Sequence, residues 1–173
     1  MKNSFFTKTL SVIIFILFSL TSSAEENKNI SEHQYNFYTG NFDFSDHKQK
    51  AIFVGFQHQN ENLNRDIFIG NASPITGGFI TENSAAYIYT GVEWNYSMSD
   101  KLKFTPSFAP GIYHEGNGKD LGHALEFKTE VQLSYSISDS TNLGMSYNHI
   151  SNASIGDKNP GANSYMFNLL KNF

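Results

Sequence analysis

Apolar and polar residues alternate along most of this sequence, and the clearest example is the stretch 121–137. One set of alternate positions carries Leu, His, Leu, Phe, Thr, Val, Leu and Tyr, and the other carries Gly, Ala, Glu, Lys, Glu, Gln, Ser and Ser. Because successive side chains of a β-strand point to opposite faces, this pattern predicts a strand with one apolar and one polar face. Such a strand is longer than most strands of soluble sheets.

The same alternation recurs in other stretches, with turn residues between them. Short connections such as 98–100 and 138–140 alternate with longer ones such as 115–120 and 152–162, as in an antiparallel meander. The third stretch has the weakest pattern, because Pro74 and the pair Gly77-Gly78 interrupt the residues that follow it. The predicted strands are 34–44, 51–58, 66–70, 85–97, 102–114, 121–137, 141–151 and 163–173.

An even number of antiparallel strands, with short turns at one end and longer loops at the other, is typical of outer-membrane barrels. The last predicted strand agrees, because Tyr165, Phe167 and the terminal Phe173 share one face. We therefore predict an all-β fold, an eight-stranded antiparallel transmembrane β-barrel of the outer-membrane type.

Periodicity does not tell which face of the barrel is outside. The alternative fold is a soluble eight-stranded barrel of the lipocalin type, whose apolar faces turn inward around a ligand. In a membrane barrel of this size, side chains fill the lumen. The charged residues on the polar faces would then form a paired network inside the barrel; they are Glu93, Glu126, Lys128 and Glu130.

The first residues have the pattern of a secretory signal peptide. Lys2 and Lys8 precede an apolar run over 10–20, and the small residues at 22–24 provide a cleavage point. The run is about half as long as a membrane-spanning helix requires. We predict a signal peptide over 1–24 and a single β-barrel domain over 25–173, exported to the outer membrane of a Gram-negative cell.

The composition excludes several classes of protein and site. The sequence has no cysteine, so it forms neither a disulfide framework nor a thiolate metal site. A net charge of −4 with Arg65 as its one arginine provides no basic surface for nucleic acid. The histidines lack metal-ligand spacing, and we therefore predict no metal and no cofactor. The oligomeric state is not determined by these features.

The stretch 141–151 ends in a candidate site. His149 and Ser151 occupy the same alternate positions as Tyr147, on the apolar face, and so should point toward lipid. If both ends of the meander are periplasmic, the seventh strand ends at the outer leaflet, where lipopolysaccharide lies. Asn163, at the start of the eighth strand, shares its face with Tyr165. An imidazole, a hydroxyl and an amide are thus predicted at one height on the lipid side.

Motifs across most of the predicted barrel carry a resemblance to a known family. They are 87–91 (YIYTG), 106–108 (PSF), 110–113 (PGIY) and 121–128 (LGHALEFK), and above all 149–153 (HISNA) with 159–161 (NPG). At these residues the chain resembles the lipid A 3-O-deacylase family, the PagL-type acyloxyacyl hydrolases.

The resemblance implies an outer-membrane barrel that hydrolyses the ester-linked acyl chain at the 3 position of lipid A, in lipopolysaccharide. It implies Ser151 as the nucleophile and His149 as the base. Asn152 and Asn159 match family positions that are associated with support of the oxyanion. These roles agree with serine hydrolase chemistry, in which a base activates the hydroxyl and fixed donors stabilise the developing negative charge.

One residue departs from the family pattern, because Asn163 stands where the family has the glutamate that orients the imidazole. An Asn oxygen can accept a hydrogen bond from the ring but cannot balance the charge of an imidazolium. The Asp-to-Asn change in a serine triad costs roughly 10⁴-fold in rate. The resemblance thus implies an impaired esterase, and the alternative is a catalytically degenerate or structural outer-membrane barrel without hydrolase activity.

Four other acidic or imidazole side chains could replace the family glutamate. Glu126 and Glu130 are predicted on the opposite face of their strand, and a bulge would be needed to turn either outward. His123 is on the correct face but is predicted about 20 Å from His149 along the strand. Asp157, in the loop, is the one candidate that this reasoning retains.

Overall fold

The computed structural model describes residues 33–46 and 49–173. The predicted signal peptide, 1–24, lies outside the described residues. Within those described ranges, no helix is long and apolar enough to cross a membrane.

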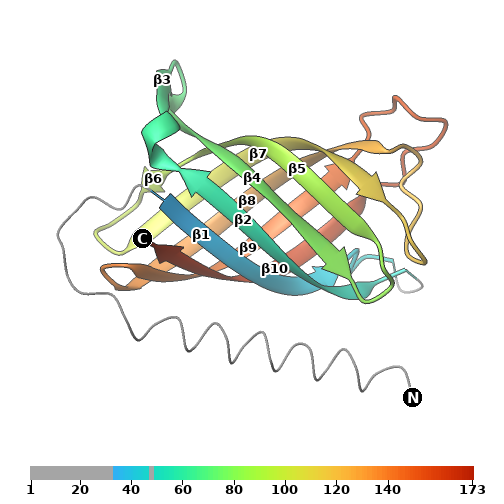
Figure 1. Cartoon of the computed structure of the whole chain (residues 1–173), viewed down its shortest axis with the longest axis horizontal. Helices are drawn as coiled ribbons and strands as arrows, with labels where there is room; N and C mark the ends of the chain where they lie inside the picture. Colours follow the sequence, from blue (N-terminus) through green and yellow to red (C-terminus); the bar gives the residue numbers. More distant parts are fainter. Residues whose placement is uncertain (1–32, 47–48) are drawn as a thin grey trace. The chain divides into compact units, whose positions relative to one another are not determined.

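Eight long antiparallel strands form a closed barrel (Figure 1). Each strand pairs with its neighbours along the chain, and β1 pairs with β10, so no long strand keeps a free edge. The strands are β1 (His33–Phe42), β2 (Ala51–Asn60), β4 (Gly70–Thr81), β5 (Ala86–Trp94), β7 (Leu102–His114), β8 (Leu125–Ser138), β9 (Thr141–Ser151) and β10 (Ala162–Asn172). The prediction of an eight-stranded antiparallel barrel is confirmed.

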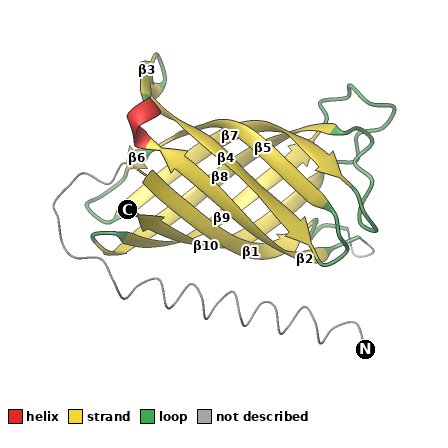
Figure 2. Cartoon of the chain, in the orientation of Figure 1, coloured by secondary structure: helices red, strands yellow, loops and turns green. Residues whose placement is uncertain are grey.

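Three short elements lie at the end of the barrel opposite the loops 115–124 and 152–161. The 3-10 helix η2 (Glu61–Leu63) and the strand β3 (Arg65–Ile67) lie between β2 and β4, and β3 pairs with the start of β4. The strand β6 (Tyr96–Ser97) pairs with β7. Figure 2 shows the long loops at one end of the strands and the η2 and β3 segment at the other.

The third strand was predicted at 66–70, and this prediction was wrong. The strand is Gly70–Thr81, and it continues through Pro74 and both glycines. Gly77 is required there because a Cβ would lie 2.7 Å from the hydroxyl of Tyr89. The Tyr38 hydroxyl donates to the Gly78 carbonyl. Gly77, a residue type that is typical of chain breaks in other contexts, here makes room for the Tyr89 side chain inside a narrow barrel.

The orientation of the faces decides between the two barrel types. Large apolar side chains cover the outside, with Ile88 70% and Phe167 64% exposed. Polar side chains fill the interior, among them Asn36, Gln132 and Asn148. An apolar outer surface with a polar interior is the arrangement of a membrane barrel and the reverse of a lipocalin. The soluble alternative is therefore excluded.

The interior charges pair only in part as predicted, because two of the four residues form an ion pair. Lys128, 2% exposed, donates to the Glu130 carboxylate at 2.8 Å, and its ammonium lies 4.0 Å from the centre of the Tyr89 ring. Glu93 accepts a hydrogen bond from Gln57 at 2.9 Å. Glu126 is buried in the same interior but joins none of the ion pairs among the described residues. The lumen is thus packed with polar side chains, although both carboxylate oxygens of Glu126 lack a hydrogen-bond partner among the described residues.

Replacing Lys128 with methionine is expected to destabilise the barrel by roughly 3–5 kcal/mol, because Glu130 then keeps a largely buried charge without its cation. Urea unfolding in detergent micelles, followed by the fluorescence of Trp94, measures the change. The matched control is Lys101→Met, in an exposed turn, which should change stability by less than about 0.5 kcal/mol. Equal unfolding midpoints for the two variants would contradict the role of the buried ion pair.

Candidate active site

His149, Ser151 and Asn163 are held by two neighbouring strands at the loop end of the barrel. In the register of β9 and β10, His149 lies directly opposite Asn163, and Tyr147 lies opposite Tyr165. The three side chains are half-buried and alternate with the buried Asn148 and Ile150, which point inward. They therefore share the outer, apolar face of the barrel.

The Asn163 side chain joins the two strands through its oxygen. The Nδ1 atom of His149 lies 2.9 Å from Oδ1 of Asn163. The Tyr147 hydroxyl donates to the same oxygen at 2.7 Å. An Oδ1 atom that faces the ring accepts a hydrogen bond from Nδ1–H, which leaves Nε2 as the basic nitrogen. The contact therefore favours the tautomer with the proton on Nδ1.

Ser151 follows His149 by two residues on the same face of β9. Its hydroxyl is half-buried and has no hydrogen-bond partner within the part of the chain that the structure describes. Catalytic hydrogen bonds are often long without substrate and tighten only in the reacting complex. The pair of residues thus offers a hydroxyl and an imidazole side by side to the surrounding lipid phase.

The loop 152–161, after Ser151, is shaped by Asn152. Its side chain is fully buried, and its Nδ2 atom donates to the carbonyls of Leu121 at 2.9 Å and Lys158 at 2.8 Å. Its Oδ1 atom accepts from the Ser154 N–H at 3.0 Å. Ala153 and Ser154 have φ values of 53° and 64°, a conformation that costs energy for residues other than glycine. The surrounding hydrogen bonds hold this strained turn beside Ser151.

Asn159 supports the same turn from the other side of the loop. Its Oδ1 atom accepts from the Asn152 N–H at 3.1 Å, and its Nδ2 atom lies 3.4 Å from the Ser154 hydroxyl. Both asparagines of the HISNA and NPG motifs therefore contact the backbone around Ser151. The Nδ2 atom of Asn152 makes two hydrogen bonds of 2.8 and 2.9 Å, whereas that of Asn159 makes one contact at 3.4 Å. Of the two amides, only that of Asn159 therefore has an N–H without a hydrogen bond.

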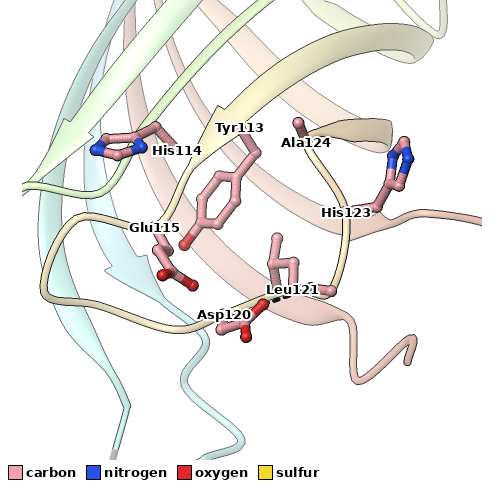
Figure 3. A pocket seen from close by; sticks show the side chains of 8 residues that line it. Tyr113, His114, Glu115, Asp120, Leu121, His123 and Ala124 are labelled. Carbon is pink, nitrogen blue, oxygen red and sulfur yellow. Dashed lines mark hydrogen bonds between the residues drawn. The ribbon is translucent and has the colours of Figure 1, made fainter. Parts of the chain in front are cut away.

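A pocket lies beside this loop, lined by residues 113–115 and 120–124 (Figure 3). Its wall also contacts the 152–161 loop, because Leu121 accepts from Asn152 and Asp120 forms an ion pair with Lys158. The hydrogen bond from Lys158, with that from the Gly122 N–H, holds the pKa of Asp120 below its usual value. None of the pocket residues is His149, Ser151 or Asn163. The pocket therefore adjoins the site without containing it.

The model of a protein family matches residues 32–172, which is most of the chain; it describes the lipid A 3-O-deacylase family, PagL. The chain belongs to this family. Membership of the PagL family, together with the barrel fold, indicates an outer-membrane protein.

Solved structures agree with the fold expected for the PagL family. The barrel is similar to the crystal structure of the outer membrane enzyme PagL, with a TM-score of 0.60 and 14% identity over 80% of this chain and 98% of that one. A de novo designed transmembrane β-barrel gives 0.58 and 9% identity over 86% and 100%. Neisserial surface protein A gives 0.55 and 10% identity over 82% and 96%. Among curated proteins, none matches the sequence.

Asp157, the candidate replacement for the family glutamate, does not contact the imidazole of His149. Asp157 is exposed in the loop, and no described hydrogen bond or ion pair joins it to His149. His123 accepts locally from the Leu125 N–H at 3.0 Å, in a loop rather than in the strand predicted from 121. In this member of the PagL family, the group that faces Nδ1 is therefore the amide of Asn163.

Sequence reasoning missed two residues near the site, Asp43 and Ser45, in the loop after β1. The Ser45 hydroxyl lies 3.4 Å from Nδ2 of Asn163, and Asp43 accepts from the Asn163 N–H at 3.4 Å. Both contacts join residues more than a hundred positions apart. No local pattern could have indicated them, since they depend on how β1 and β10 close the barrel.

Proposed function

We propose that this protein is an outer-membrane esterase that removes the 3-O-linked acyl chain of lipid A. The nucleophile is Ser151, the base is His149, and the group that orients the base is Asn163. The single observation that carries the proposal is the 2.9 Å contact between His149 Nδ1 and Asn163 Oδ1, on the lipid side of a PagL-family barrel and next to Ser151.

In the proposed reaction, Nε2 of His149 takes the proton of the Ser151 hydroxyl as its oxygen attacks the ester carbonyl. A tetrahedral intermediate forms and collapses, and the imidazolium gives its proton to the 3-oxygen of the sugar as the C–O bond breaks, so that the sugar leaves with a free 3-hydroxyl. Water then hydrolyses the acyl-serine by the same steps, which releases the fatty acid and restores the enzyme. Asn163 keeps the ring oriented throughout.

We propose different roles for the two asparagines of the loop. Asn159 has an amide N–H that is free to stabilise the oxyanion, a contribution worth about 10²–10³-fold in comparable enzymes. Asn152 acts through the shape of the turn, since its own amide already donates to the carbonyls of Leu121 and Lys158.

A second candidate function is favoured by one observation, the neutral side chain at position 163. An amide cannot balance the charge that His149 acquires when it takes a proton. A degenerate barrel that retains the fold without useful hydrolysis would have the same arrangement. The two functions differ in whether acyl chains are released.

The test is a lipid A deacylation assay. Protein purified in detergent is mixed with lipopolysaccharide, and mass spectrometry follows the loss of one hydroxy fatty acid from lipid A. We expect slow release by the wild-type chain and none above background by Ser151→Ala. The absence of release by the wild-type chain, or equal release by the variant, would favour the non-enzymatic barrel.

Replacing Gly161 with alanine is expected to lower the deacylation rate about 10²-fold, because a displacement of the base of about 1 Å has an effect of that size. Gly161 has a φ of +62°, and a Cβ there would lie 2.8 Å from Cε1 of His149. The new methyl group would displace the imidazole from its present position. The same mass-spectrometric assay measures the rate.

Gly118→Ala is the matched control for this variant. It also adds a methyl group in a loop at this end, but its nearest atom would be the Ala85 Cβ at 3.1 Å, far from the imidazole in the chain. It should retain the wild-type rate within about twofold. Equal losses in the two variants would show that an added methyl group in a loop, and not the position of His149, lowers the rate.

A further inference from the structure

We propose that the ion pair between Lys119 and Asp43, acting through Ser45, fixes the orientation of the Asn163 amide and thereby the tautomer of His149. Lys119, Asp43 and Ser45 are positioning residues in this proposal, which rests on the proposed esterase function for its effect on rate. It explains how a neutral amide can occupy the position of an acid and still prepare the base.

An asparagine at this position can face the imidazole in two ways, unlike a carboxylate. With Oδ1 toward the ring, the amide accepts from Nδ1–H, and Nε2 is left free to take the Ser151 proton. With Nδ2 toward the ring, the amide donates to Nδ1, and the proton moves to Nε2. The second arrangement removes the base. The orientation of the Asn163 amide therefore determines whether Nε2 of His149 can act as the base.

The contacts of Asn163 differ in how well they choose between the two orientations. The Tyr147 hydroxyl, 2.7 Å from Oδ1, does not choose, because a phenol can donate to an oxygen or accept from an NH₂ group. The Ser45 hydroxyl, on the other side of the amide, could likewise donate or accept if it had no other partner. The choice then depends on what else the Ser45 hydroxyl contacts.

The Ser45 hydroxyl has an acceptor beside it that uses its proton. It donates to Oδ1 of Asp43 at 3.2 Å. As a carboxylate, Asp43 can only accept, and its other oxygen lies 2.5 Å from the ammonium of Lys119. With its proton directed to Asp43, the Ser45 oxygen can only accept from Asn163. The NH₂ group of Asn163 is thus drawn toward Ser45 at 3.4 Å, and its oxygen toward His149.

The backbone holds this relay in place. Asp43 is 1% exposed and has a φ of 49°, a conformation that Asp tolerates better than most residues. The Phe44 N–H donates to the Asn163 carbonyl at 3.0 Å. The centre of the Phe44 ring lies 4.4 Å from the centre of the ring of Tyr165, the next outward residue of β10. The loop after β1 is therefore fastened to the strand that carries Asn163.

The first test reads the tautomer directly and requires no activity. Protein labelled with ¹⁵N-histidine is purified in detergent, and its imidazole nitrogens are recorded by NMR at a pH where the ring is neutral. The signals of His149 are those missing from His149→Gln. We expect the Nδ1–H form in the wild-type chain and a substantial Nε2–H population in Ser45→Ala. Ser45→Thr keeps the hydroxyl and should restore the wild-type spectrum.

The result that overturns the proposal is a His149 tautomer that does not change in Ser45→Ala, or an Nε2–H form in the wild-type chain. Because this arm needs no substrate, a chain that releases no acyl group would refute the esterase function and leave the relay to be judged by NMR alone.

The second test is a double-variant cycle in the deacylation assay. Ser45→Ala should lower kcat about 2- to 10-fold with KM unchanged, the effect expected when one neutral hydrogen bond no longer biases the amide. In an Asn163→Asp background the same change should alter kcat less than about twofold, since a carboxylate has no wrong orientation. An equal loss in both backgrounds would show that Ser45 acts by another route, and the relay would be rejected.

Discussion

The Asn163→Glu variant is expected to release the acyl chain of lipid A about 10²- to 10⁴-fold faster than the wild-type chain. A carboxylate at this position accepts from Nδ1 of His149 as the amide does, and in addition it balances the charge of the imidazolium in the transition state. The opposite change, from Asp to Asn in a serine triad, costs roughly 10⁴-fold. The gain should appear in kcat, because the charge develops only during the reaction.

The surroundings of Asn163 can accommodate this carboxylate. Tyr147 already donates to the side-chain oxygen at 2.7 Å. Ser45 lies 3.4 Å from the amide and can turn its hydroxyl toward an acid. The repulsion from Asp43 is reduced because Lys119 pairs with that residue. The family pattern, with glutamate at this position, agrees with a site that can hold the acid.

Asn163→Gln is the matched control, since it has the length of glutamate without the charge. It should give no gain, and kcat/KM from mass-spectrometric time courses separates the two variants. A rise of similar size in the glutamine variant would attribute the effect to side-chain length. No rise in the glutamate variant would mean that the absence of an acid at this position does not limit the rate of the wild-type chain.

The second large effect is expected from removal of the nucleophile or the base. Ser151→Ala and His149→Ala should each lower the rate about 10²- to 10³-fold in the wild-type chain, and the double variant should be no slower than either. Residues that act as one unit lose their joint effect when any one of them is removed. Losses that multiply in the double variant would show that His149 and Ser151 act independently.

The size of these losses should depend on position 163. In the Asn163→Glu background the unit is complete, and the same Ser151→Ala change should cost about 10⁴-fold or more. Ser138→Ala changes an exposed serine that ends β8, next to the turn at the opposite end of β9; this control should leave the rate unchanged. An identical loss in both backgrounds would contradict the assignment of position 163 to the catalytic unit.

The lipid-facing position of the site could be predicted because it depends on the simplest rule of a strand. A period of two places His149 and Ser151 on the face of Tyr147, and a short turn at 138–140 sets the register with the preceding strand. In the structure, His149 pairs with Thr129 of the preceding strand. Local pattern and short connections are sufficient for this part of the site.

The third strand could not be predicted from the same rule. Its glycines depend on neighbouring strands, since a Cβ at Gly77 would lie 2.7 Å from the Tyr89 hydroxyl of β5 and one at Gly78 would lie 2.7 Å from the Tyr87 carbonyl. The role of Asn152 was hidden for a similar reason, because its partners include Leu121, in the loop before β8. Residues whose contacts lie far away in the sequence have no local sequence pattern that would reveal their role.

The pairing of β1 with β10 has a consequence for when the protein becomes competent. The hairpin of β9 and β10 can bring His149 and Asn163 together by itself, but Asp43 and Ser45 reach Asn163 only after the first and last strands have met. The orientation of the Asn163 amide is thus fixed only when β1 pairs with β10. Under the proposed esterase function, a chain still in the course of assembly would have its nucleophile in place but its base less well oriented, so hydrolysis of the surrounding lipid would be slower until the barrel has closed.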